Sequence, residues 1–230
     1  MNNFDLTVAL ATAPSSAFAE LRERPRFWFP LLLVVLSSAG LIFWYYGVVD
    51  IEWYKQTQLA STPDFQAMDD DKRASALSML TSNTLKWGSM ASLVIFIPVI
   101  YLLQALCLWL ASKVTKLPQG FKHWFTLVCW SSLPVLLGTV VAAILLFLSD
   151  TPQVSPGLLQ QLSLNELLFH VPPGRGYGLL SSISIPAILG WVLMIIGVRV
   201  WSQRSWAFSA AFILVLLFIV YGIWAFFSFR

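Results

Sequence analysis

Five long apolar runs dominate the pattern of hydrophobic and polar positions, and none of them contains an Asp, Glu, Lys, Arg or His. As an α-helix, a run of 22 to 25 residues is about 33 to 38 Å long, enough to cross a hydrocarbon core of about 30 Å. Because no water satisfies backbone polar groups there, the runs must be helical. The pattern predicts an all-α, polytopic integral membrane bundle with five transmembrane helices, at residues 27–49, 87–110, 124–148, 177–198 and 206–227.

Positive charges in the connections between these runs indicate the orientation of the chain. With the N-terminus inside, the inner segments contain eight basic residues close to the spans, expected to act as cytoplasmic anchors: Arg22, Arg24, Arg26, Lys113, Lys116, Lys122, Arg199 and Arg204. The outer segments contain six, which are Lys55, Lys72, Arg73, Lys86, Arg175 and Arg230. Since short, positively charged loops stay in the cytoplasm, we expect a cytoplasmic N-terminus and an external C-terminus.

Residues 1–26 are expected to form a short, amphipathic cytoplasmic segment before the first apolar run. Ala17-Phe18-Ala19 resembles a signal-peptidase site, but the preceding stretch contains no Lys or Arg and no long apolar core. We therefore expect an uncleaved signal anchor. As an amphipathic helix, residues 16–24 would place Phe18 and Leu21 toward lipid, with the arginines among anionic headgroups.

Composition agrees with a membrane protein. The chain is 58% hydrophobic and 11% charged, against about 45 to 50% apolar and 25% charged in soluble domains. Its net charge of +3 is spread over several connections, so it indicates no nucleic-acid-binding surface. Both cysteines lie within apolar runs, where they behave as small hydrophobic residues.

The two outer connections are the longest polar segments. The first, at residues 50–86, is expected to contain a short helix at 68–83 that begins in the run Asp69-Asp70-Asp71. The second, at 149–176, contains Leu167, Leu168 and Phe169, which are suited to the bilayer surface or to capping the bundle. Neither connection is long enough for a core of its own.

Within the spans, prolines and small residues are the candidate functional positions. The absence of ionisable residues argues against ion-coupled transport. Pro98, Pro134 and Pro186 lie near the middle of their runs, where they are expected to bend helices and could border a neutral path. Small residues four positions apart predict close helix packing, within the bundle or in a homo-oligomer. They are Gly88 with Ser92, Gly138 with Ala142, and Gly190 with Pro186.

Glu166 and His170 stand four positions apart and could share a helical face as a metal pair or an acid-base couple. No third ligand is close in the sequence, so an ion pair or a helix cap is the simpler interpretation. No Ser/His/Asp or Cys/His arrangement can be assembled on one side of the membrane. We therefore expect no enzyme activity, cofactor or metal.

Three stretches together resemble the Yip1 family of five-span membrane proteins: FWFPLLLVVLSS at 27–38, LPQGFKHWFTLVCWSSLPVLLGTV at 117–140, and SISIPAILGWVLMIIGVRVWSQRSWAFSAAFILVLL at 182–217. The resemblance implies a five-helix domain over residues 27–230. Eukaryotic relatives are adaptors of vesicle traffic that bind prenylated Rab GTPases. This chain lacks their Asp-Leu-Tyr-Gly-Pro stretch, so the resemblance does not extend GTPase binding to it. Its compact form resembles the bacterial branch, which implies the plasma (inner) membrane.

Three functional hypotheses follow. The first is a non-enzymatic scaffold or adaptor that associates with itself or with other membrane proteins. The second is a transporter, channel or lipid-handling protein with a neutral path between proline-bent helices. The third is a membrane enzyme that uses Glu166 and His170.

Overall fold

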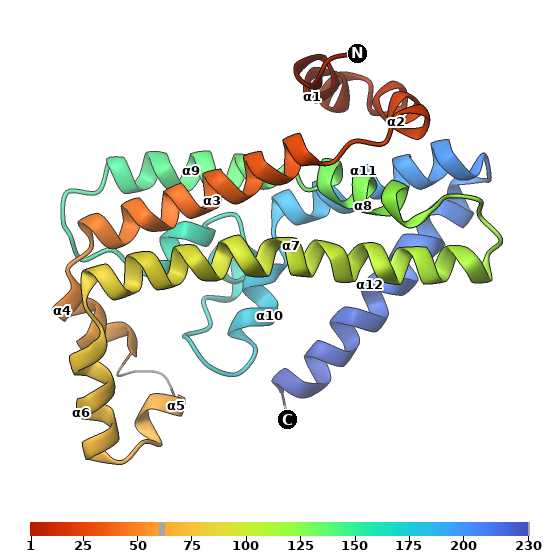
Figure 1. Cartoon of the computed structure of the whole chain (residues 1–230). Coiled ribbons are helices and arrows are strands. Elements are labelled where there is room, and N and C mark those ends of the chain that lie inside the picture. The colour runs from red at the N-terminus through yellow and green to blue at the C-terminus, as the bar shows by residue number, and fades with distance from the viewer. Residues whose placement is uncertain (60–62, 230) are drawn as a thin grey trace. The chain divides into compact units, whose positions relative to one another are not determined.

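The computed structural model describes residues 1–59 and 63–229, which form an all-α fold without a β-strand in those ranges. Residues 60–62 and 230 lie outside the described residues, so part of the expected connection at 50–86 and the outer cation Arg230 are not placed. The helices (Figure 1) are α1 Asn3–Thr12, α2 Pro14–Glu23, α3 Trp28–Val48, α4 Ile51–Tyr54, η1 Lys55–Leu59, α5 Pro63–Gln66, α6 Asp70–Met79, α7 Ser82–Val114, α8 Phe121–Ser131, α9 Val135–Phe147, η2 Pro156–Gln160, η3 Asn165–Phe169, α10 Tyr177–Ser182, α11 Ile185–Ser202 and α12 Trp206–Ser228.

Five helical segments are long and apolar enough to span a membrane, as the hydropathy pattern predicts. They are Trp28–Val48, Ser82–Val114, Phe121–Phe147, Ile185–Ser202 and Trp206–Ser228. The chain is therefore a five-span integral membrane protein. The boundary between a segment at 1–26 and a membrane domain at 27–230 stays a prediction.

The fourth apolar run is divided into two helices instead of the single helix expected at 177–198. α10 ends at Ser182 and α11 begins at Ile185. The link pairs with an earlier segment: Leu164 N donates to Ile183 O at 2.6 Å, and Ile185 N donates to Leu162 O at 2.9 Å. The backbone groups freed by the break are thus satisfied outside the helix.

Prolines explain two of the helix boundaries in the spans. Pro186 lies in the first turn of α11, where a missing N–H costs nothing, so it does not bend the middle of a span as expected. Pro134 lies in the break between α8 and α9, and the residue before a proline is disfavoured in a helix. Pro98 lies inside α7, which continues past it.

The chain divides into two compact units, and most of the spans contribute to both. Unit 1 comprises Met1–Val34, Phe96–Val135 and Pro186–Phe227. Unit 2 comprises Val35–Ile95, Leu136–Ile185 and Ser228–Arg230. Unit 1 therefore contains α1, α2, α8 and nearly all of α11 and α12, whereas unit 2 contains the two long connections.

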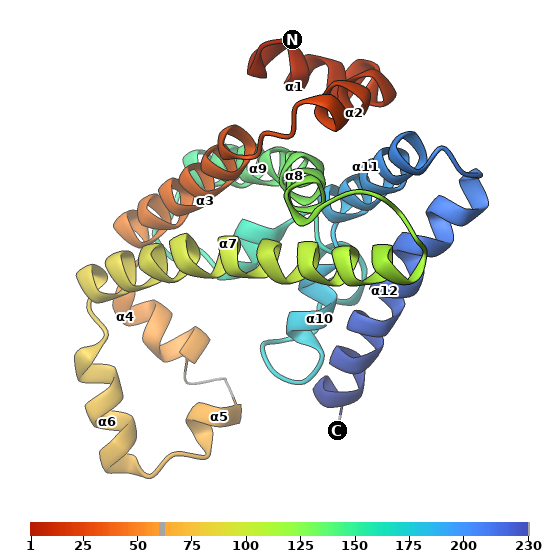
Figure 2. The ribbon, with the colours of Figure 1, turned by 45° about the vertical axis from the view of Figure 1, so that its right-hand side comes forward.

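In unit 1, the N-terminal helices α1 and α2 pack against each other (Figure 2), and α2 also packs on α8. Asn2 caps α1 through a reciprocal pair of hydrogen bonds with Asp5. Phe18 and Leu21 of α2 have no exposed surface, which corrects the expectation that they face lipid. The apolar face of α2 packs against protein, because α8 and α11 cover it.

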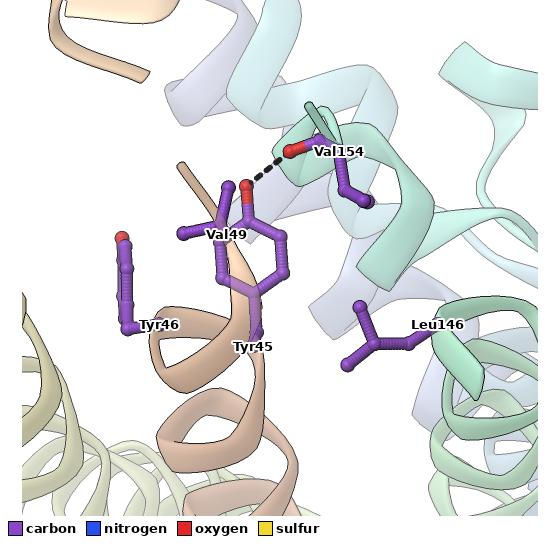
Figure 3. Close-up of a cluster of buried hydrophobic side chains, with 5 residues drawn as sticks. All are labelled: Tyr45, Tyr46, Val49, Leu146 and Val154. Atoms are coloured by element: carbon purple, nitrogen blue, oxygen red, sulfur yellow. Dashed lines mark hydrogen bonds between the residues drawn. The ribbon is translucent and has the colours of Figure 1, made fainter. Parts of the chain in front are cut away.

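In unit 2, a cluster of buried side chains joins α3, α9 and the second long connection (Figure 3). Its members are Tyr45, Tyr46, Val49, Leu146 and Val154. The hydroxyl of Tyr45 donates to the carbonyl of Val154 at 2.7 Å. The backbone N–H of Asp50 donates to Pro152 O at 2.8 Å. The second connection is therefore hydrogen-bonded both to α3 and to the start of the first connection.

The helix expected at residues 68–83 is present as α6 but is shorter, and it contains no buried residue. Asp70 and Asp71 occupy its first turn, where they favour the positive end of the helix. Its ion pairs are exposed, with Lys72 to Asp69 at 3.1 Å and Arg73 to Asp70 at 3.2 Å. Such pairs contribute at most about 1 kcal/mol each. The guanidinium of Arg73 also donates to the backbone oxygens of Phe65, Gln66 and Met68, so it connects α6 to the segment before it.

Candidate functional site

The eight basic residues expected as anchors all belong to unit 1, and several are held by specific contacts. Arg26 pairs with Glu20 at 3.3 Å and donates to Met1 O at 2.6 Å. Arg204 lies 4.5 Å from the ring centre of Phe208 and donates to Thr115 O at 2.9 Å. These contacts fix part of the positive charge on the fold, whereas the following anchors are exposed without such contacts: Arg22, Arg24, Lys116 and Lys122.

Two further anchors lie against tryptophan rings in unit 1. The Nζ atom of Lys113 lies 5.2 Å from the ring centre of Trp109, and the guanidinium of Arg199 lies 6.0 Å from that of Trp206. Tryptophan favours the boundary between water and bilayer, where a cation can stay hydrated while its stem packs on the ring.

Buried tryptophans organise the centre of unit 1. The indole N–H of Trp130 donates to Arg26 O at 2.6 Å, and that of Trp201 donates to Phe18 O at 2.7 Å. The amide of Gln119 donates to Trp201 O at 3.0 Å. The N-terminal segment is therefore attached to α8 by a part-buried hydrogen bond and to α11 by a buried one.

Some of the predicted small residues pack inside the chain, and others are open. A Cβ atom on Gly190 would lie 2.7 Å from Ser131 O, so α11 approaches the backbone at the end of α8. Ala142 is buried and Gly138 is half-buried. A larger side chain at Gly190 or Ala142 would therefore disturb the fold itself.

Gly88 and Ser92 differ from these positions, because both are exposed on α7. No atom lies within 4 Å of the position that a Cβ on Gly88 would occupy. This pair is thus available for contact outside the chain.

A polar residue that the sequence analysis did not single out lies on another part of α7. Gln104 is exposed in the apolar run, together with Ile100, Leu103 and Cys107. We call these four residues of unit 1 the Gln104 face. At 1.5 Å per residue, Gln104 lies about 9 Å inside the end of the run at Leu110. The amide has no hydrogen-bond partner among the described residues.

Glu166 and His170 line the same pocket in unit 2, which has a volume of about 410 Å³. Its wall is formed by Tyr54, Ser155, Pro156, Gly157, Asn165, Glu166, His170, Val171, Pro172, Pro173 and Tyr177. The two residues do not share a regular helical face: η3 is a π-helix, and His170 ends it in a left-handed conformation with φ of 51°. A role for them as a metal pair or an acid-base couple stays a prediction.

The side chain of Asn165 determines the shape of this part of the pocket. It is buried, and its Nδ2 donates to Val171 O at 3.2 Å while its Oδ1 accepts from Val171 N at 3.0 Å. The same Nδ2 donates to Glu166 Oε1 at 3.1 Å. We call the segment 165–171, closed in this way, the Asn165 loop.

Two tyrosines give the pocket neutral phenol groups. Burial raises the pKa of Tyr54, and the hydrogen bond to Tyr46 raises it further. Burial also raises the pKa of Tyr177, and the nearby charge of Glu166 adds to the increase. Both hydroxyls therefore stay protonated at physiological pH.

The sequence analysis missed three kinds of residue: an amide inside a span, a buried amide in a loop, and a buried tryptophan. A search of the spans for amides as well as charges would have found Gln104. No pattern in a single sequence distinguishes the buried Asn165 or Trp201 from other residues of their type, because their roles depend on contacts with distant segments. In the described part of the chain, no three His, Cys, Asp or Glu residues are grouped to hold a metal ion.

The comparisons with known proteins agree with the resemblance and with a membrane protein. The model of a family described as the Yip1 domain matches residues 8–227. The chain is 29% identical over 191 residues to a Bacillus subtilis protein named membrane protein YknW, covering 82% of this chain and 74% of that protein. No solved structure matches the chain.

Proposed function

This chain belongs to the Yip1 family, and from that premise we propose a function. We propose that it is a non-enzymatic membrane scaffold that associates with a second copy of itself. The observation that supports this proposal is the Gln104 face on α7. Only 11% of the residues in the apolar window of α7 are buried, against 28% or more in the first, third and fourth spans. The helix thus has a large surface for contact with lipid or with another helix.

An amide in hydrocarbon favours a helix partner over lipid. Lipid tails offer neither a donor nor an acceptor, so a lipid-facing Gln104 would leave its amide unsatisfied. A copy related by a two-fold axis presents the same amide, and each side chain can both donate and accept. Interhelical hydrogen bonds of this kind contribute about 0.6 to 1.7 kcal/mol each. Gln104 would therefore fix the register of an interface that packing stabilises.

The proposed setting is the plasma (inner) membrane, with the N-terminus in the cytoplasm and the C-terminus outside. Supporting this orientation, all eight predicted anchors belong to unit 1, and both long connections belong to unit 2. In this orientation, the buried tryptophan contacts of unit 1 would hold α1 and α2 near the cytoplasmic surface, where they could form a binding surface for other proteins.

Cross-linking through the native Cys107 tests the proposed self-association. Cys107 lies three residues from Gln104 and is exposed, whereas Cys129 is buried. Oxidation of native membranes, or treatment with a short thiol cross-linker, should give a dimer of the chain. Cys107→Ser should abolish the cross-linked dimer because it removes the reactive thiol, and Cys129→Ala should leave the yield of cross-linked dimer unchanged.

The role of the amide is tested with Gln104→Leu, which should clearly reduce the fraction of dimer without lowering thermal stability. Leu214→Ala, at an exposed position on α12, is the matched control and should have no effect. A cross-link to a different protein instead of a second copy would overturn the proposed homodimer. So would a dimer that forms equally well with Gln104→Leu.

A further inference from the structure

The pocket in unit 2 carries a negative charge, which indicates the class of ligand that it could bind. Among the residues that the structure describes, its wall contains the carboxylate of Glu166 and no Lys or Arg side chain. Among the described residues, Glu166 forms no ion pair, since its Oε1 accepts only from the neutral amide of Asn165. A half-buried carboxylate without a cation favours a positively charged ligand.

The position of Glu166 depends on a glycine across the pocket. A Cβ on Gly157 would lie 2.8 Å from Glu166 Oε1, so any other residue there would displace the carboxylate. Gly157 is itself held in η2, where its N–H donates to the hydroxyl of Ser155 at 3.3 Å. Glycine at 157 thus leaves room for the carboxylate, and Asn165 donates a hydrogen bond to it.

We propose that this pocket binds the ammonium group of a primary or quaternary amine. The carboxylate of Glu166 supplies the opposite charge, and the rings of Tyr54 and Tyr177 supply aromatic surface, which attracts organic cations. Pro156, Pro172 and Pro173 supply apolar contacts for the carbon atoms next to the nitrogen. The volume of about 410 Å³ lies within the range of small-molecule sites, about 300 to 1,000 Å³.

Other classes of ligand fit the pocket less well. A phosphate or carboxylate ligand would meet the charge of Glu166, and no described Lys or Arg in the wall would compensate for it. A divalent metal ion requires several oxygen or nitrogen ligands, and the described residues contain no such group of three. An organic cation needs only one carboxylate and aromatic surface.

The Asn165 loop indicates where the amine could come from. Between the residues that line the pocket, the loop exposes Leu167, Leu168 and Phe169, with exposed fractions of 47%, 68% and 58%. Three adjacent exposed apolar side chains at the end of a membrane span are suited to insertion among lipid headgroups. Inserted there, they would bring the pocket to the level of headgroup amines. A soluble amine would carry the same chemistry.

Native mass spectrometry of the full chain in mild detergent tests the proposal. Phosphatidylethanolamine and phosphatidylglycerol with the same acyl chains are added separately, and ethanolamine is added as the soluble probe. We expect retention of phosphatidylethanolamine to exceed that of phosphatidylglycerol about tenfold, and Glu166→Gln to remove this preference. Glu52→Gln changes an exposed carboxylate of the first connection that pairs with Lys55, and it should have no effect.

His170→Lys is a second variant that leaves the contacts between Asn165 and Glu166 intact. It places a positive charge in the wall and should also remove the preference. Retention of ethanolamine that competes with the lipid, or that occurs without lipid binding, would support the pocket and identify a soluble amine. Equal retention of both lipids without ethanolamine binding would overturn the proposal. The cross-linking of Cys107 does not depend on this pocket, so the two proposals can fail separately.

Discussion

The indole N–H of Trp201 donates a 2.7 Å hydrogen bond to the carbonyl of Phe18, a residue 183 positions earlier in the chain. The two side chains also meet edge to face, with ring centres 6.3 Å apart. Both residues are buried in unit 1. The N-terminal helix α2 is therefore a packed part of the membrane protein, and residues near the end of α11 hold it in place.

Trp201→Phe should loosen the N-terminal segment. The substitution keeps most of the ring but removes the donor, so the carbonyl of Phe18 keeps only the hydrogen bond that it accepts within α2. Loss of this buried hydrogen bond should cost about 0.5 to 1.5 kcal/mol. Limited proteolysis or hydrogen exchange should show faster opening of residues 3–23. Trp44→Phe, at an exposed position on α3, serves as the control. Equal protection of the segment in wild type and Trp201→Phe would contradict this role.

The N-terminal segment shows why part of the fold is not visible in the sequence. An apolar stripe containing Phe18 and Leu21 predicts a helix that buries one face, but the pattern is the same whether lipid or protein covers that face. The hydropathy of the five runs was sufficient to predict the spans, because the requirement for satisfied backbone groups leaves helices as the solution.

The break between α10 and α11 was not predictable for a related reason. Residues 177–198 are uncharged throughout, and hydropathy does not indicate that Ile183 and Ser184 leave the helix. The break is compatible with the fold because Leu162 and Leu164 provide backbone partners from another connection. The pocket was not predictable from the sequence for the same reason. Glu166 and His170 stand four positions apart and were singled out by that spacing, whereas Tyr54 and Gly157 come from segments that are distant in the sequence.

Gly190→Ala should destabilise the protein, whereas Gly222→Ala should not. A Cβ on Gly190 would lie 2.7 Å from the backbone oxygen of Ser131, which cannot move without shifting the end of α8. Overpacking of this kind costs about 1 to 3 kcal/mol. At Gly222 no atom lies within 4 Å of the added Cβ, and alanine should favour the helix by about 0.5 to 1 kcal/mol. Thermal unfolding in detergent compares the two, and similar midpoints would contradict the close approach of α11 to α8.

Asn165→Ala should open the Asn165 loop. The change removes both hydrogen bonds to Val171 and the bond to Glu166. Leaving the half-buried N–H and carbonyl of Val171 unpaired should cost up to about 1 to 3 kcal/mol for each group that water does not reach. Hydrogen exchange at residues 165–171 should become faster, with Asn83→Ala, at an exposed position on α7, as the matched control. Unchanged exchange in this loop would show that other contacts determine its shape.

Tyr45→Phe should weaken the connection between α3 and the segment around Val154. The ring and its packing in the cluster stay, but the buried carbonyl of Val154 loses its donor. We expect a loss of stability of about 1 to 3 kcal/mol. Tyr54→Phe removes a longer, part-buried contact of 3.3 Å to the hydroxyl of Tyr46, and its effect should be smaller. If Tyr54→Phe destabilised the protein more than Tyr45→Phe, the hydrogen bond to Val154 would not be the main contact here.

Single-cysteine labelling should establish the orientation of the chain. In a background with Cys107→Ser and Cys129→Ala, one cysteine replaces Met79 in the first long connection and another replaces Val114 at the end of α7. Both positions are exposed, at 69% and 84%. Met79 precedes α7 in the chain and Val114 is its last residue, so the membrane-spanning helix separates them. If the eight anchors are cytoplasmic, a membrane-impermeant maleimide should label Met79→Cys in intact cells, and it should label Val114→Cys only after permeabilisation. The reverse pattern would place the N-terminus outside, and the Asn165 loop and its pocket would then face the cytoplasm.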